Sequence, residues 1–147
     1  MKYEEIIAGF QALQASDSER MNVDARGLER LAELTDALMS APEPEKAIPE
    51  LFSVMERLPD ADLGSPGPLV HILERMHGYE GELVRSVRRQ PSPLSVWMVN
   101  RILNTDVSDD ARQSYLFLLN EALKHSTAPE TVREDVRGFI ERQTRKT

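Results

Sequence analysis

Apolar residues recur every three or four positions along almost the whole of this 147-residue chain. That spacing places apolar side chains on one face of an α-helix, whereas a half-buried strand needs strict alternation, which no segment sustains. The β-branched residues that strands favour are not enriched in these segments either. The pattern therefore predicts an all-α fold of seven or eight helices. The length predicts a single domain over residues 1–147.

Prolines, glycines and polar clusters divide this pattern into the individual helices. We predict helices over residues 3–15, 22–40, 45–58, 68–76, 79–89, 93–104 and 109–124, and an eighth that follows residue 127. Ser92 is predicted to cap the helix that begins at Pro93, and Thr127 with Glu130 is predicted to form a capping box. Ser108, Asp109 and Asp110 are predicted to open the helix over 109–124. Short connections favour antiparallel neighbours, and no repeat has a fixed period. We therefore expect an irregular HEAT-like stack of antiparallel helices.

Three helices carry the residues that matter most for core and function. The helix over 22–40 has a predicted core arc made of Leu28, Leu31, Ala32, Leu34, Leu38 and Met39. The helix over 93–104 has a broad apolar arc, and its opposite face carries Trp97, Asn100, Arg101 and Asn104. That face is either buried against neighbours that satisfy its amides or a recognition surface, because Trp and Arg are enriched in binding hot spots. Phe117 lies on the polar side of the next helix, as an exposed anchor or against a further layer.

The charge of the chain is negative and unevenly distributed. The net formal charge is −7, and residues 1–66 alone hold 14 acids and 6 bases. A basic groove for nucleic acid is not expected from this balance. An acidic surface either steers a basic protein into contact or only keeps the chain soluble.

Other features of the sequence narrow the class of protein. The chain has no cysteine, which excludes disulfides and thiolate chemistry. Its first ten residues do not form a signal peptide, and no apolar run has the length of a membrane helix. We expect a soluble, cytoplasmic protein that does not contact a membrane.

The sequence carries no clear catalytic motif. His71, Glu74 and His77 include one Glu-x-x-His pair, whereas a di-iron bundle needs two such pairs and further glutamates. Neither a Gly-x-Ser-x-Gly elbow nor a glycine-rich phosphate loop is present. We expect a protein without enzymatic activity, metal or cofactor. A metal-dependent enzyme that uses Glu74 and His77 remains the alternative that metal analysis would test.

One segment resembles a known family. Residues 91–104 read Pro-Ser-Pro-Leu-Ser-Val-Trp-Met-Val-Asn-Arg-Ile-Leu-Asn. This run, within a similarity over residues 69–123, resembles a signature of small α-helical immunity proteins from bacterial polymorphic toxin and contact-dependent inhibition systems. The resemblance implies a non-enzymatic protein that binds a cognate toxin domain and blocks its activity.

A basic toxin, such as a nuclease, would contact an acidic surface. The first candidates are the carboxylates Glu29, Glu33, Asp36, Glu43, Glu45, Asp60 and Asp62. Candidate anchors outside the acidic part are Trp97, Arg101 and Phe117. A helical adaptor that regulates other proteins is the competing interpretation, and a gene position with no toxin gene beside it would favour that adaptor.

Overall fold

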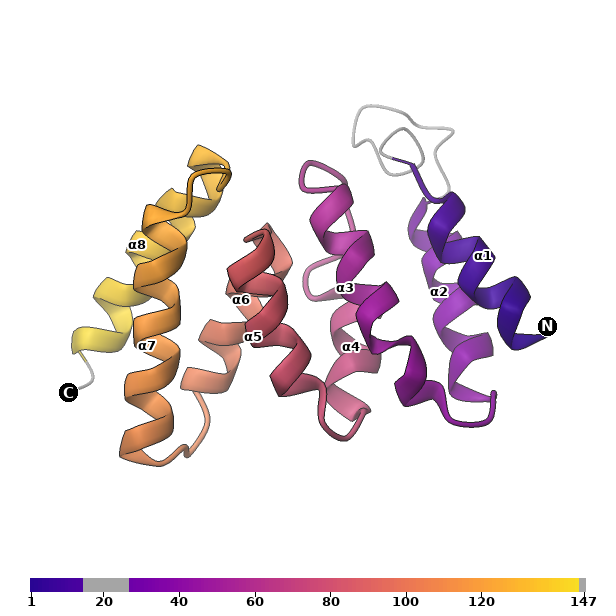
Figure 1. The fold of residues 1–147 in the computed structure, drawn as a ribbon, viewed down its shortest axis with the longest axis horizontal. Coiled ribbons are helices and arrows are strands. Elements are labelled where there is room, and N and C mark those ends of the chain that lie inside the picture. The colour runs from indigo at the N-terminus through magenta and orange to yellow at the C-terminus, as the bar shows by residue number, and fades with distance from the viewer. Residues whose placement is uncertain (15–26, 146–147) are drawn as a thin grey trace. The chain divides into compact units, whose positions relative to one another are not determined.

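A computed structural model describes residues 1–14 and 27–145 of the chain (Figure 1). Within these residues the regular elements are helices, and no strand is present. They are α1 (Tyr3–Ala12), α2 (Gly27–Met39), a short 3-10 helix η2 (Pro44–Ala47), α3 (Ile48–Arg57), α4 (Gly67–Arg75), α5 (Tyr79–Arg89), α6 (Pro93–Leu103), α7 (Asp109–Lys124) and α8 (Glu130–Arg145). The predicted all-α fold is confirmed.

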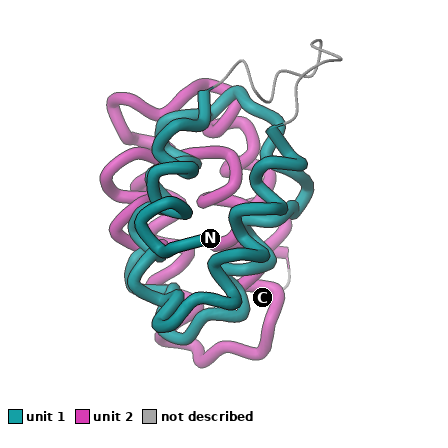
Figure 2. The backbone as a smooth tube through the Cα atoms, turned by 90° about the vertical axis from the view of Figure 1, so that its right-hand side faces the viewer, with its two compact units in different colours: residues 1–82 teal, residues 83–147 magenta. Residues whose placement is uncertain are grey.

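The chain divides into two compact units, residues 1–82 and residues 83–147 (Figure 2). The boundary falls inside α5, not in the proline-rich loop after α3. Unit 1 holds 17 acids and 7 bases, a net charge of −10, whereas unit 2 holds 8 acids and 11 bases, a net charge of +3. The acidity predicted for the N-terminal part therefore belongs to unit 1. That the whole chain is one domain stays a prediction.

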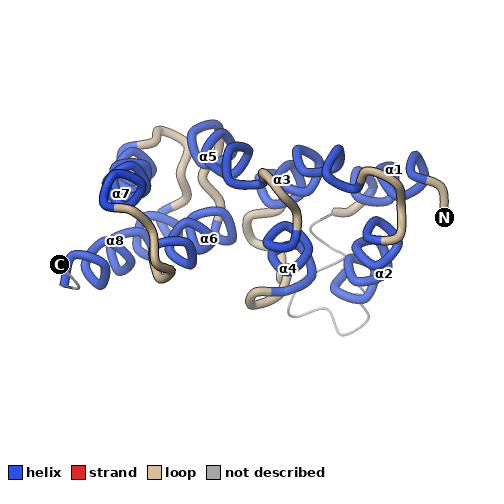
Figure 3. The backbone as a smooth tube through the Cα atoms, turned by 90° about the horizontal axis from the view of Figure 1, so that it is seen from below, coloured by secondary structure: helices blue, strands red, loops and turns tan. Residues whose placement is uncertain are grey.

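Unit 1 contains two layers of helices. α1 packs beside α3 in one layer and α2 beside α4 in the other (Figure 3). Side chains such as Phe10, Leu34, Phe52 and Leu73 are completely buried between them. Gly9 allows α1 to approach α2 closely, because a Cβ there would lie 2.5 Å from Cδ2 of Leu34. Within their layer, α2 and α4 are therefore direct neighbours.

Unit 2 is held together by α6, α7 and α8, each of which packs on the other two. Its apolar core includes Val96, Val99, Leu119, Val132 and Val136, all of them fully buried. Val96 and Val99 on α6, and Val132 and Val136 on α8, are three or four residues apart, as the buried face of an amphipathic helix requires. The HEAT-like arrangement of the helices stays a prediction.

Two predicted helix starts are confirmed. Ser92 caps α6, and its hydroxyl accepts a hydrogen bond from the Ser95 amide at 3.2 Å while the Ser92 amide donates to the Ser95 hydroxyl at 3.0 Å. Ser108 caps α7 in the same way, with its hydroxyl accepting from the Ala111 amide. Both starts depend on residues within one turn, which the sequence displays directly.

The predicted end of the first helix is wrong. α1 ends at Ala12, and next to this end the guanidinium of Arg57 donates to the carbonyl oxygens of Phe10 and Leu13 at 3.1 and 3.3 Å. A cation at the C-terminal end of a helix binds its last carbonyl oxygens and complements the helix dipole. Residue 15 and the predicted helix start at 22 lie outside the described residues.

Two further predicted starts are also corrected. The helix predicted from residue 45 begins with η2, and α3 starts at Ile48 with Pro49 in its first turn, where a missing amide hydrogen is tolerated. The capping box predicted for Thr127 is absent, because α8 starts at Glu130. The Thr127 hydroxyl instead donates to Oε1 of Gln90 at 2.8 Å.

Candidate protein-binding surfaces

Three of the predicted carboxylates share one exposed face of α2. Glu29, Glu33 and Asp36 follow one another along successive turns. The Glu33 carboxylate forms an ion pair with Arg30 at 3.2 Å. Among residues 1–14 and 27–145, the negative charges of Glu29 and Asp36 have no ion-pair partner.

The other four carboxylates lie at opposite ends of α3. Glu43 and Glu45 precede this helix, whereas Asp60 and Asp62 follow it. A helix of ten residues is about 15 Å long, so the two pairs do not form one patch with each other. Asp62 accepts a hydrogen bond from the Gly64 amide at 3.2 Å within its own loop.

One of these acids is also neutralised by a neighbouring lysine. Glu43 contacts Lys46 at 2.8 Å, and the hydrogen bond and charge of Glu43 raise the pKa of the Lys46 ammonium. The face of α2 is therefore the acidic surface on which neighbouring carboxylates remain available to a partner.

The prediction that Leu28 and Met39 belong to the core is wrong. Their side chains are 38% and 42% exposed, whereas Leu31, Leu34 and Leu38 are fully buried. At 100° per residue, Leu28 and Met39 lie within about 40° of Ala32, on the border between the core face and the acidic face. The helix therefore presents apolar side chains to solvent beside its carboxylates.

A groove lies between α2 and α4 next to these apolar side chains. Its volume is about 420 Å³, and its lining comprises Ala32, Thr35, Asp36, Met39, Gly67, Pro68, His71, Ile72 and Arg75. Thr35 and Ile72 are buried, whereas His71 and Arg75, the ionisable side chains that α4 contributes to the lining, are exposed. We call this feature the α2–α4 groove. Sequence reasoning missed it because a single helix pattern does not show which side a neighbouring helix leaves open.

The candidate anchors of unit 2 differ in exposure. Trp97 and Arg101 are half-buried on α6, and the Arg101 guanidinium carbon lies 5.8 Å from the centroid of the Trp97 ring. Phe117 is 63% exposed on α7, where its neighbours one turn away are polar. Of the two arrangements considered for Phe117, the structure therefore has the exposed side chain. Trp97 and Arg101 contact each other, in a cation–π geometry.

The amides of α6 hold the helices of unit 2 together. Nε2 of the buried Gln143, on α8, donates to Oδ1 of Asn100 and to Oδ1 of Asn104, both at 2.8 Å. Arg112, on α7, donates to the side chain and the backbone carbonyl of Gln143. Asn100 and Asn104 therefore support the interpretation of a central helix whose amides are satisfied by neighbours. The burial of Gln143 was not predicted, because its neighbours in sequence do not distinguish it from an exposed glutamine.

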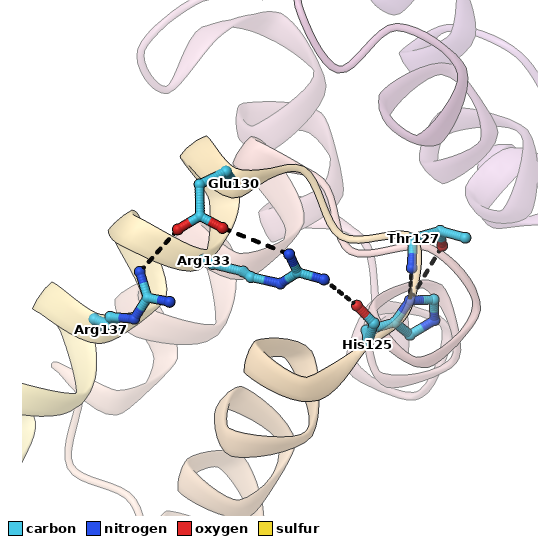
Figure 4. Close-up of polar contacts among 5 residues, drawn as sticks. All are labelled: His125, Thr127, Glu130, Arg133 and Arg137. Carbon is cyan, nitrogen blue, oxygen red and sulfur yellow. Dashed lines mark hydrogen bonds and ion pairs between the residues drawn. The ribbon is translucent and has the colours of Figure 1, made fainter.

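A polar junction joins the end of α7 to its neighbours (Figure 4). Nδ1 of His125 accepts a hydrogen bond from the Thr127 amide at 3.2 Å. Nε2 therefore carries the ring proton in the neutral imidazole and donates it to the Arg88 carbonyl, 2.9 Å away. The guanidinium of Arg133 donates to the His125 carbonyl at 2.7 Å. Both ring nitrogens are used, which gives His125 a structural role.

Glu130 begins α8 beside this junction (Figure 4). Its carboxylate accepts from Arg137 at 3.1 Å and from Arg133 at 3.5 Å. The hydrogen bond from Arg137, and then the contacts with Arg133, hold the pKa of Glu130 below its usual range. A negative charge here also complements the positive end of the helix dipole.

The histidines of α4 and the following turn were the candidate metal ligands. His71 and His77 are both exposed. Among residues 1–14 and 27–145, no three histidine, aspartate or glutamate side chains are grouped so that they could hold a metal ion. In the same residues, no helix combines the length and the apolar character needed to cross a membrane.

Comparison of the chain with protein-family models, curated proteins and solved structures gives no significant match. The likeness of residues 91–104 to immunity proteins therefore stays a prediction from the sequence. In the structure, these residues contribute α6, its Ser92 cap and the amides that bind Gln143. Most of that segment is thus occupied with packing unit 2.

Proposed function

We propose that this protein is an immunity protein, which binds a cognate bacterial toxin domain in the cytoplasm and neutralises it by protein–protein contact. One observation carries the proposal. α2 presents exposed apolar side chains, Leu28 and Met39, beside the carboxylates of Glu29 and Asp36, which form no ion pair with another described residue. Apolar anchors bordered by charge are what a specific protein interface needs. Inhibition by occlusion requires no catalytic group of the inhibitor.

The charge of unit 1 supports a basic partner. A net charge of −10 over residues 1–82 creates a potential that attracts a positively charged domain and raises the association rate. Complementary charge also disfavours acidic partners. A stable complex buries about 800 Å² on each partner, so the interface extends beyond the face of α2. The toxin we infer is therefore a domain with a basic surface, of which a nuclease is one example.

Co-expression tests this function directly. The chain is produced together with the protein encoded by the neighbouring gene, and growth and co-purification are scored. We expect growth to be rescued and the two proteins to co-purify. Toxicity that the chain does not relieve, with no complex recovered, would contradict the proposal.

A matched pair of variants links the rescue to the acidic face. Glu29→Lys/Asp36→Lys reverses two charges on α2, and Glu134→Lys/Asp135→Lys reverses two exposed charges on α8. Both pairs change the net charge equally. We expect weaker rescue only for the α2 pair. Equal rescue by both pairs would remove the acidic face from the interface.

A further inference from the structure

We propose that the α2–α4 groove is the docking site for one amphipathic, cationic helix of the partner protein. The identity of that partner as a toxin rests on the proposed function. The site itself rests on its shape, its apolar lining and the distribution of charge along its two walls. Each of these features lies within unit 1.

The floor and the rim of the groove suit apolar anchors. Ile72 and Thr35 form buried surface, at 3% and 6% exposure, and Ala32 and Pro68 add small apolar surface. Met39 lies on the rim, where its flexible thioether side chain can adapt to a bound residue. Leu28 continues the apolar line along α2 beyond the groove. Water is therefore in contact with the apolar side chains of Met39 and Leu28, which a partner would cover.

The length of this apolar line fits a short helix. From Leu28 to Met39 the chain advances eleven residues, which is about 16 Å or three turns of α-helix. A helix that docks in a groove uses apolar anchors spaced at i, i+4, i+7 and i+11. Three turns of a partner helix present such a set over the same distance.

The two walls of the groove carry opposite charge. On the α2 side, Asp36 lines the groove, and Glu29 lies on the same face of α2 about two turns towards its N-terminus, outside the lining. Neither carboxylate has an ion pair among the described residues. On the α4 side the exposed ionisable groups are His71 and Arg75. A bound helix with lysines or arginines along one flank therefore places them on the α2 wall. The net charge of −10 on unit 1 selects the cationic flank as the dominant contact.

A peptide titration tests the groove without any toxin. The full chain carries ¹³C-methyl methionine and is titrated with a peptide of about 14 residues that has leucine at i, i+4, i+7 and i+11 and lysine along one flank. A second peptide has glutamate in place of each lysine. We expect the lysine peptide to shift the Met39 methyl resonance saturably, and the glutamate peptide to bind at least about tenfold more weakly.

Two variants and a control locate the binding. Ala32→Lys places a cation in the groove, and Asp36→Lys reverses the charge of an exposed residue on its rim. Either change is expected to lower the affinity for the lysine peptide by about tenfold or more. Ser114→Lys adds the same charge on the exposed side of α7, in unit 2, and is expected to leave binding unchanged.

Each remaining outcome separates this inference from the proposed function. An unchanged Met39 resonance at about 1 mM peptide would overturn the groove as a helix site. A shift caused by raising the concentration of the chain alone would also overturn it, because the occupant would be a second copy. Peptide binding without rescue in co-expression would keep the groove and refute the immunity function. Full rescue with unchanged toxin affinity in Asp36→Lys would refute the groove and keep that function.

Discussion

Gln143 is the buried polar residue that joins three helices of unit 2. It is 1% exposed, and its side-chain amide contacts Asn100 and Asn104 on α6 and Arg112 on α7. A buried polar group that loses its partner costs the desolvation that the hydrogen bond had offset. The contribution of Gln143 to stability is therefore larger than that of a typical glutamine.

Removing this side chain tests that role. We expect Gln143→Ala to lower the free energy of unfolding by about 2 to 4 kcal/mol, because Asn100 would be left buried without its donor. Urea unfolding measured by circular dichroism gives the value. Gln113→Ala, at an exposed position on α7, is the control and should change stability by about 0.5 kcal/mol or less. Equal effects of the two substitutions would refute the network.

Core residues of α2 show which part of the candidate site could be predicted from the sequence. The apolar pattern predicted Leu31, Leu34 and Leu38 as core correctly, because they lie at the centre of the apolar arc of α2. It predicted Leu28 and Met39 wrongly, because residues at the edge of an arc are buried only if a neighbouring helix covers them. That covering depends on α4, which lies more than 25 residues further along the chain. The sequence therefore predicted the acidic face of α2, but not the groove beside it.

Helix starts are encoded by their own residues. Ser92 and Ser95 exchange hydrogen bonds at the start of α6, and both side chains are buried. We expect Ser92→Ala to destabilise the protein by about 1 to 2 kcal/mol in thermal or urea unfolding. Ser114→Ala, on the exposed side of α7, should alter stability by no more than about 0.5 kcal/mol. An unaffected Ser92→Ala protein would mean that the cap contributes little.

The start of α8 predicts a pH dependence. Because the pKa of Glu130 is lowered in the folded state, its charge stabilises the protein above the ordinary pKa of a glutamate, and this contribution is lost as the pH falls through the lowered value. Glu130→Gln should therefore be slightly less stable than the wild type at pH 7 and equal to it in strong acid. Melting temperatures across that pH range measure the difference. A difference in melting temperature between the two proteins that stays the same at every pH would contradict this role of the Glu130 charge.

Predicted helix boundaries were correct where a local cap sets them and wrong where a distant residue takes part. The Ser-Pro start of α6 and the Ser108 start of α7 were correct because caps act over one turn. The end of α1 is contacted by Arg57, which is 47 residues from Phe10 in sequence. The Thr127 cap was also wrong, since that hydroxyl bonds to Gln90 instead. Long-range side chains take part in both cases, and neither is visible in a local pattern.

Whether the two units unfold together can be measured with the single tryptophan. Trp97 lies in unit 2, so its fluorescence reports on residues 83–147, whereas helical circular dichroism reports on both units. α5 runs without a break through the boundary at residues 82 and 83. We therefore expect the two signals to show one coincident transition in urea. Separated midpoints would show two domains and refute the single-domain prediction.

The central claim is that the chain acts through the charge and shape of a preformed helical surface. Its most direct test is the association rate with the purified toxin domain, measured by stopped flow at several salt concentrations. For the wild type we predict a fast rate that falls steeply as salt rises. The triple reversal of Glu29, Glu33 and Asp36 to lysine should slow association by about tenfold or more at low salt. A rate that neither salt nor the triple reversal changes would contradict the claim.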